Sequence, residues 1–286
     1  YINWRAFFPV WNLDASFAEL AEIKGCGHCQ AQWIAAQKPE RIAATMQAMD
    51  LLKDARAAIA RLVREAGDSI SAKIAFRKAK SVGDDSISFE VGGNDIVLPV
   101  LRQQYVNAKG ECWSLADFVS PSSDYVGAFA VTIGEKITQI VESYKEKDEF
   151  KFLLYQSLAD RLVEASAEYL HKAVREQYWG YDRTDLAVSD TLAEKYVGIR
   201  PAAGYPSLPD QSSVFVINEV LGGTKELGMQ ITENGALKPA SSVMGLYISH
   251  ADSRYFILKK ICDDQRKRYA EQKGISMEEL ERWLPK

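Results

Sequence analysis

One stretch combines residue types that could bind an anionic ligand, and it runs from Gly198 to Pro206 as Gly-Ile-Arg-Pro-Ala-Ala-Gly-Tyr-Pro. Proline fixes φ near −65° and removes an N–H donor, whereas glycine allows positive φ and close approach of another molecule. Arg200 offers a planar, two-pronged donor to a carboxylate or phosphate. The spacing predicts a rigid, open loop that binds such a group. The alternative is a turn whose arginine pairs with a surface acid.

Three acidic side chains are further candidates. Asp160 and Glu164 stand four residues apart in a segment with helical periodicity, so both carboxylates share one helix face. From spacing alone this face could equally be a solvated surface. Glu194 lies six residues before Arg200, within a short helix expected from about 190 to 196. This helix would deliver the chain into the arginine loop.

A Cys-x-x-Cys motif, formed by Cys26 and Cys29 around His28, is the last candidate from residue type. A structural zinc site needs four ligands, and the other histidines, His171 and His250, offer no second pair with suitable spacing. Four scattered cysteines also do not make a disulfide framework. We interpret the motif as an unliganded thiol pair, and we expect no metal and a reducing, cytoplasmic setting.

Composition narrows the function classes. The chain has 286 residues, 47% of them hydrophobic and 26% charged, which is typical of a globular protein. A net charge of −4 without a basic stripe argues against nonspecific nucleic-acid binding. No apolar run reaches the roughly 18–20 residues that span a bilayer, so we expect no membrane partner. The first residue is Tyr1 rather than methionine, and we expect a fragment of a larger multidomain enzyme.

Hydrophobic periodicity places the expected elements around these candidates. Apolar residues at helical spacing predict helices at 39–66, 135–145, 148–178, 261–272 and 276–283. On the 148–178 helix the expected buried stripe is Leu154, Leu158, Leu162, Ala165, Tyr169 and Ala173. Alternation and related patterns predict strands at 70–76, 87–91, 96–100, 242–250 and 253–259, while 214–221 fits either a helix or a strand. The run 124–132 is apolar on both faces, which predicts a central strand. The first eleven residues, with five aromatics, form either an ordered arm or a hydrophobic latch.

These elements predict an α+β fold. We expect one domain over residues 1–286, with a central twisted, mainly antiparallel sheet flanked by long helices.

Short motifs in a consistent order then connect the chain to a known family. They are Tyr-Ile-Asn-Trp at 1–4, Val-Gly-Asp-Asp at 82–85, Leu-Arg-Gln-Gln at 101–104, Leu-Ala-Asp-Phe-Val at 115–119, Tyr-Val-Gly-Ala-Phe-Ala-Val-Thr at 125–132, Leu-Ala-Asp-Arg-Leu at 158–162, Ala-Glu-Tyr-Leu-His at 167–171, Tyr-Trp-Gly-Tyr at 178–181, the Arg200 loop, and Glu-Arg-Trp-Leu at 281–284. Together they resemble the C-terminal activation domain of cobalamin-dependent methionine synthase. The resemblance covers nearly the whole chain and is weakest between about 14 and 37.

The resemblance implies a repair function. Such a domain binds S-adenosylmethionine and presents its methyl group to cobalamin held by a neighbouring domain. One electron from a flavodoxin-type donor and that methyl group restore methylcobalamin from inactive cob(II)alamin. The chain would thus belong to a methyltransferase, with no catalytic residue of its own. It would turn over only with the cobalamin-binding domain and the electron donor.

The resemblance also implies roles for particular residues. In the expected S-adenosylmethionine site, Arg200 binds the ligand's carboxylate. Backbone groups around Ala202, Gly204 and Tyr205 line the ligand. Tyr255 and Phe256 pack against it as an aromatic pair, and Glu194 flanks the site. Asp160 and Glu164 would face the cobalamin domain and help the cobalt-ligating histidine when it leaves the metal.

Two departures from the family pattern affect this site. Asn3 stands where the family has an aspartate that meets the ligand's ammonium group, so the ion-pair component is lost and weaker binding is expected. Residues 207–211 lack the usual His-Thr continuation of the loop. Two alternatives stay open: a reactivation module of another corrinoid methyltransferase, and a docking module for the redox partner that no longer binds ligand.

Overall fold

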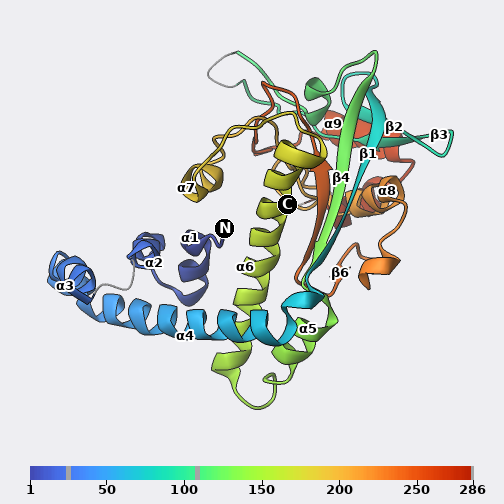
Figure 1. Cartoon of the computed structure of the whole chain (residues 1–286). Helices are drawn as coiled ribbons and strands as arrows, with labels where there is room; N and C mark the ends of the chain where they lie inside the picture. The colour runs from blue at the N-terminus through green and yellow to red at the C-terminus, as the bar shows by residue number, and fades with distance from the viewer. Residues whose placement is uncertain (24–26, 107–109, 285–286) are drawn as a thin grey trace. The chain divides into compact units, whose positions relative to one another are not determined.

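The computed structural model describes residues 1–23, 27–106 and 110–284 (Figure 1). Contacts divide the chain into two compact units, one formed by 1–71 with 133–169 and the other by 72–132 with 170–286. The single-domain prediction for residues 1–286 therefore stays a prediction. Cys26, half of the predicted thiol pair, lies outside the described residues.

The first unit is helical. Its α-helices are α1 (Trp4–Phe7), α2 (Glu19–Glu22), α3 (Gly27–Ala35), α4 (Ile42–Ala66), α5 (Gly134–Glu142) and the larger part of α6 (Glu149–Ala173). The predicted helices at 39–66 and 135–145 are confirmed by α4 and α5, and the one at 148–178 by α6 with the π-helical turn Val174–Tyr178 that continues it. Tyr169 is an error in the predicted stripe, because 62% of its side chain is exposed. Leu154, Leu158 and Leu162 are buried as predicted, whereas Ala165 and Ala173 are only half-buried. Further buried positions are Val163, Ala167 and His171.

The aromatic N-terminus folds into the core of this unit. Phe7 and Phe8 are fully buried, and the ring of Phe8 lies 6.2 Å from that of Phe17. Pro9 lies in the first turn of the 3-10 helix Phe8–Trp11, where its missing N–H is not needed. The segment is helical rather than extended, which favours the latch over the arm.

The second unit contains a five-stranded sheet in the order β3-β2-β1-β4-β7 (Figure 1). Its strands are β1 (Ser71–Ser81), β2 (Ser86–Val91), β3 (Asn94–Pro99), β4 (Asp124–Thr132) and β7 (Ser242–Tyr247). The β1–β2, β2–β3 and β4–β7 pairs are antiparallel, and β4 has neighbours on both sides, as the strand patterns predicted. The α+β class with a mainly antiparallel sheet is confirmed.

Smaller elements complete the second unit. They are α7 (Val188–Leu192), α8 (Ser213–Leu221), the β5–β6 pair (Gln230–Ile231 with Leu237–Lys238), α9 (Asp263–Lys273) and α10 (Met277–Trp283). The segment 214–221 is a helix, α8, which packs on β3, β4 and β7. Ser276 caps α10 as predicted, because its hydroxyl accepts from the Glu279 N–H at 3.1 Å.

The predicted strand at 253–259 is wrong, because those residues form no ladder. Their hydrogen bonds go to single side chains instead, including those of Ser207 and Gln103. Alternation in this segment therefore reflects burial without sheet pairing.

Candidate functional site

The Arg200 loop runs along the outer edge of β7 as an irregular extra strand. Ile199 and Ile248 exchange two backbone hydrogen bonds of 2.9 and 3.0 Å. Further along, the Leu246 N–H donates to the Pro201 carbonyl at 2.9 Å and the Ala203 N–H to the Met244 carbonyl at 3.0 Å. These bonds bind most of the loop to the sheet, so its shape depends on residues about 45 positions away in the sequence.

Two glycines make this arrangement possible. A Cβ at Gly245, in the middle of β7, would lie 2.4 Å from the Pro201 carbonyl oxygen and 2.8 Å from the Ala202 Cα. Only a residue without a side chain lets the loop approach the strand so closely. Gly204 has φ +83° and turns the chain at the loop's far end, as the glycine spacing predicted. The need for glycine at 245 has no signal in the sequence, because a glycine within a strand pattern does not reveal its neighbour.

The structure brings the loop to the segment that carries the predicted aromatic pair. The backbone N–H of Arg200 donates to the Tyr255 hydroxyl at 2.9 Å. Phe256 is buried and holds the Ser207 hydroxyl through both its backbone N–H and its carbonyl. Ala202 is buried against β7, whereas Tyr205 at the turn is 45% exposed. Six of the predicted site residues thus lie in one continuous structure: Arg200, Ala202, Gly204, Tyr205, Tyr255 and Phe256.

A buried histidine, His171, lies beside this loop, and the sequence patterns predicted no functional role for it. The ring of His171 is fully buried, stacks on Tyr247 at 5.3 Å and lies 3.1 Å from the Tyr181 hydroxyl through its Nε2. Burial, followed by the positive charges of Arg200 and Arg175, holds the pKa of His171 well below its ordinary value. His171 is therefore neutral at physiological pH. The only sequence signal was its place in the 167–171 motif.

An ion pair buried in the same unit fixes the chain ahead of the loop. Nη1 of Arg175 lies 3.1 Å from the Asp182 carboxylate, and its guanidinium lies over the Tyr196 ring at 4.5 Å. Asp182 also accepts from the N–H groups of Thr184 and Val197. Burial pushes the pKa of Asp182 up, but these hydrogen bonds outweigh it and bring the pKa below its ordinary value. The pair ties the π-helical turn after α6 to the residues just before Gly198.

The remaining predicted residues come from other segments of the chain. Glu194 follows α7 in an exposed stretch, with a left-handed φ of +57°. Asn3 belongs to the first unit, where it precedes α1. Asp160 and Glu164 also belong to that unit, are half-buried on α6 and share one helix face, with Gln156 donating to Asp160 at 3.2 Å.

Three of the family motifs meet in one ion network in the second unit. The guanidinium of Arg102 donates twice to the Asp117 carboxylate, each time at 2.7 Å, and its Nε donates to Asp85 at 2.9 Å. A bidentate arginine–carboxylate pair is among the stronger charged contacts. Gln265 of α9 both accepts from and donates to the Arg102 backbone. The motifs therefore hold the loop after β3 to α9, which begins just beyond the Tyr255–Phe256 segment.

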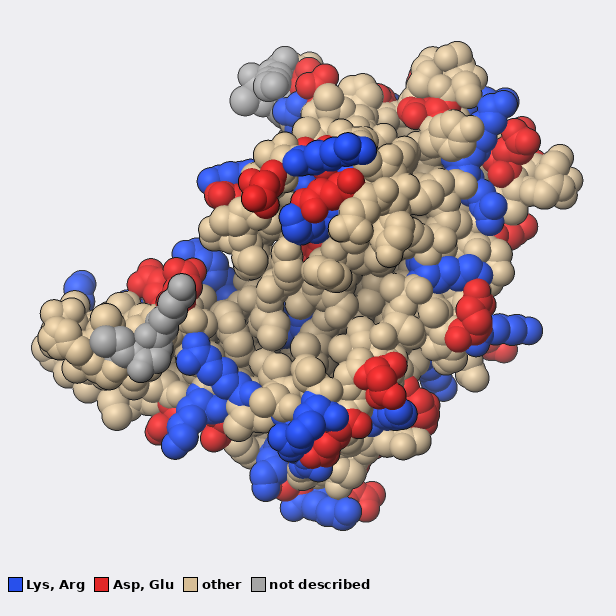
Figure 2. Space-filling model, viewed as in Figure 1, with Lys and Arg blue, Asp and Glu red and all other residues tan. Residues whose placement is uncertain are grey.

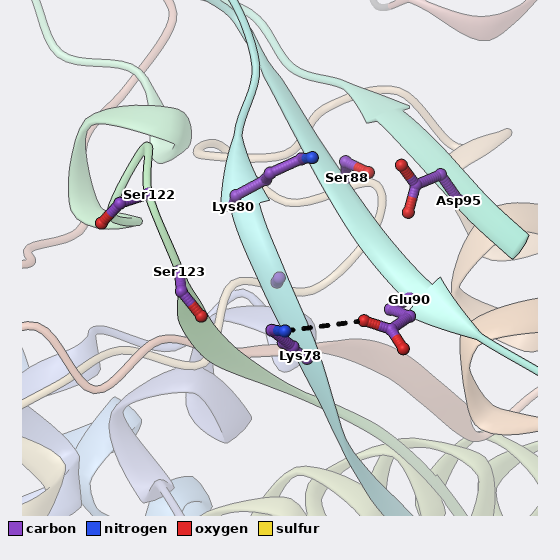
Figure 3. Close-up of a pocket in the computed structure, with 8 residues that line it drawn as sticks. Lys78, Lys80, Ser88, Glu90, Asp95, Ser122 and Ser123 are labelled. Carbon is purple, nitrogen blue, oxygen red and sulfur yellow. Dashed lines mark ion pairs between the residues drawn. The ribbon is translucent and has the colours of Figure 1, made fainter. Parts of the chain in front are cut away.

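A separate pocket lies on the surface of the sheet (Figure 3). Lys78 points toward Glu90 on the next strand, and the pair is 3.9 Å apart. The lining of the pocket carries both charges and several hydroxyl groups, and none of the predicted site residues belongs to it. The lining residues are Lys78, Ala79, Lys80, Ser88, Glu90, Asp95, Ser122 and Ser123. Such a surface is typical of the solvated face of an antiparallel sheet.

Basic and acidic side chains are interspersed over the face seen in Figure 2. Within the described residues, no cluster of three or more His, Cys, Asp or Glu side chains is arranged to hold a metal ion. Among the same residues, no helix combines the length and apolar character needed to cross a membrane.

The structure is thus an α+β protein in which an arginine-bearing loop is hydrogen-bonded to the edge strand of a five-stranded sheet. The family described as "Vitamin B12 dependent methionine synthase, activation domain" matches residues 1–274, and the chain belongs to that family. A solved structure described as "Crystal Structure of the MetH Reactivation Domain bound to AdoHcy" is similar, with 35% sequence identity and a TM-score of 0.80. That similarity covers 99% of this chain and 84% of the solved one.

Proposed function

We propose that this chain binds S-adenosylmethionine and supplies its methyl group for the reductive methylation of cob(II)alamin, which reactivates a cobalamin-dependent methionine synthase. The observation that carries the proposal is the Arg200 loop, fastened to β7 and to Tyr255 in a chain that belongs to the activation-domain family. The similar solved structure holds AdoHcy, the product that remains when S-adenosylmethionine gives up its methyl group.

The residues of the loop suit such a ligand. The Arg200 guanidinium binds the carboxylate of the methionine moiety as a two-pronged donor. Gly204 and Tyr205 lie at an exposed turn, where backbone groups and an aromatic ring can contact the ligand. The half-buried Tyr255 and the buried Phe256 form the wall beside Arg200. We propose that Glu194, six residues before Arg200, flanks the bound ligand. The role of these residues is to bind and orient the ligand so that its sulfonium methyl is presented for transfer.

Two partners complete the reaction. We propose that Asp160 and Glu164 face the cobalamin-binding domain of the same enzyme, where carboxylates can accept a proton or hydrogen bond from the cobalt-ligating histidine once it is released. Cobalamin supplies the metal that receives the methyl group, and a flavodoxin-type donor supplies the one electron. The chain alone is expected to bind its ligand without turnover.

Calorimetric titration of S-adenosylmethionine into the chain tests the proposal. Wild type should bind, and Arg200→Ala should lose about 10- to 100-fold in affinity, because a hydrogen bond to a charged group contributes about 1.5–3 kcal/mol. Arg282→Ala, an arginine with a largely exposed side chain in the same unit, is the matched control and should bind like wild type. No binding by wild type at millimolar ligand would overturn the proposal and favour a docking module.

A further inference from the structure

We propose that Ser207 is a positioning residue for the ligand site, because its hydroxyl fastens the Arg200 loop to the Tyr255–Phe256 wall. The inference rests on the proposed function, since it concerns how the same site keeps its shape. Ser207 lies in the 207–211 stretch, where the sequence departs from the family pattern. It is 4% exposed, so bulk water does not compete for its hydroxyl.

The hydroxyl of Ser207 pairs with both backbone polar groups of Phe256, its N–H and its carbonyl. It donates to the Phe256 carbonyl at 2.8 Å and accepts from the Phe256 N–H at 2.9 Å. Both contacts are buried, and the segment around Phe256 belongs to no strand. One side chain therefore takes the place of the ladder bonds that the alternating sequence of 253–259 predicted.

A second hydrogen bond joins the loop to the Tyr255–Phe256 wall on the other side of the turn. The Arg200 N–H donates to the Tyr255 hydroxyl at 2.9 Å. Between the two fastenings the chain turns tightly, with Gly204 N–H bound to the Leu208 carbonyl and Leu208 N–H to the Tyr205 carbonyl, both at 2.9 Å. The turn that would present Gly204 and Tyr205 to the ligand is thus held at both ends against one wall.

The wall is anchored independently of the loop. The Ile257 carbonyl accepts from Gln103 Nε2 at 3.2 Å and from the Tyr105 hydroxyl at 2.7 Å. Gln103 is itself buried and exchanges hydrogen bonds with the Trp113 backbone. Removing the Ser207 hydroxyl should therefore leave the wall in place and release the end of the loop that follows the Gly204–Tyr205 turn.

The consequence is a loss of ligand affinity beyond the loss of stability. In Ser207→Ala the Phe256 N–H and carbonyl remain buried without a partner, unless the loop moves to admit water. Ligand binding must then restore the loop, and we expect the affinity for S-adenosylmethionine to fall about tenfold, the equivalent of about 1.4 kcal/mol.

Ser242 provides a matched control in the same unit. Its hydroxyl also makes two hydrogen bonds, to the Thr132 hydroxyl at 2.9 Å and the Pro239 carbonyl at 2.7 Å, and neither partner belongs to the loop or the wall. Ser242→Ala should lower stability without changing ligand affinity. Amide hydrogen exchange offers a second measurement, because the Phe256 N–H should lose protection in Ser207→Ala and keep it in Ser242→Ala.

The experiment titrates S-adenosylmethionine into wild type, Ser207→Ala and Ser242→Ala, with urea unfolding of each. Weaker binding and faster Phe256 exchange in Ser207→Ala alone support the proposal. Equal affinities for the two alanine variants overturn it while wild-type binding still supports the function, whereas no binding by wild type overturns the function itself. If Ser207→Ala does not fold, Ser207→Cys replaces it with a weaker donor and acceptor. Intermediate affinity then supports the proposal, and wild-type affinity overturns it.

Discussion

The Arg200 loop and the acidic face of α6 both carry candidate functional residues, but they are built in opposite ways. The loop takes its shape from hydrogen bonds to β7 and to Tyr255, which are about 45 and 55 residues away in the sequence. Asp160 and Glu164 share a face because α6 has a regular turn between them. The first arrangement depends on distant residues, and the second only on the helix.

This difference predicts where each region is sensitive to mutation. A substitution far from the ligand can distort the loop, because strand, wall and loop support one another. A substitution on the α6 face changes one side chain and leaves its neighbours where the helix puts them. Substitutions at the residues that support the loop should therefore impair its function. On the α6 face, only substitutions of the acidic residues themselves should have an effect.

The largest effect is expected from Gly245→Ala. The new Cβ would lie 2.4 Å from the Pro201 carbonyl oxygen and 2.7 Å from the Phe129 ring, so the loop must leave the strand. We expect a loss of about 1–3 kcal/mol in the free energy of unfolding, measured in urea, together with loss of S-adenosylmethionine binding. Gly67→Ala is the control, because its Cβ would meet only the Val63 side chain at 3.5 Å. Equal stability of the two variants would contradict the close packing of loop and strand.

A second prediction concerns acid stability. The pKa of His171 is lowered by burial and by the charges of Arg200 and Arg175, so the unfolded chain binds a proton at a higher pH than the folded one. The stabilisation is present above the unfolded pKa of about 6.5 and is lost as the pH falls below it, by up to about 1.4 kcal/mol per pH unit. Urea midpoints of wild type between pH 7 and 5 should show this slope.

His171→Gln removes the titrating group and should flatten that slope, although it lowers stability at pH 7 by replacing a buried ring. His250→Gln, which replaces an exposed histidine, is measured beside it as the control. A slope in His171→Gln as steep as that of wild type would place the acid sensitivity in other groups.

The same contrast separates what the sequence could predict from what it could not. Helical periods predicted α4, α5 and α6, and alternation predicted β1, β2 and β3, because the sequence repeats with the face that each element buries. The central strand β4 was predicted from a run that is apolar on both faces. The prolines and glycines of residues 198–206 predicted the stiff loop, because each of them sets the backbone conformation at its own position. Gly245, His171 and Ser207 could not be found in this way, because each acts through a contact with a distant segment. The error at 253–259 has the same origin, since its hydrogen bonds go to side chains rather than to a strand.

Asn3→Asp should have a smaller effect. A charge-assisted hydrogen bond to the ligand's ammonium group is roughly twice as strong as a neutral one, so we expect about fivefold tighter binding of S-adenosylmethionine by calorimetry. The substitution also places a negative charge before the first turn of α1, which can raise stability without ligand. Thermal unfolding without ligand measures that contribution separately. Equal affinities of the two proteins would contradict the role that the resemblance implies for this position.

The smallest effect on the chain itself is expected from Asp160→Asn and Glu164→Gln, which keep the shape of each side chain and remove its charge. Both residues are half-buried on a regular helix, so unfolding free energy should change by less than about 1 kcal/mol and S-adenosylmethionine affinity should not change. In the whole enzyme, the role proposed for these residues predicts slower reactivation from cob(II)alamin, because the carboxylates proposed to pair with the released histidine lose their charge. Glu149→Gln, in the first turn of the same helix, is the control and should reactivate normally. Weaker ligand binding in the isolated chain would show that the α6 face supports the ligand site and is not confined to contacts with the cobalamin domain.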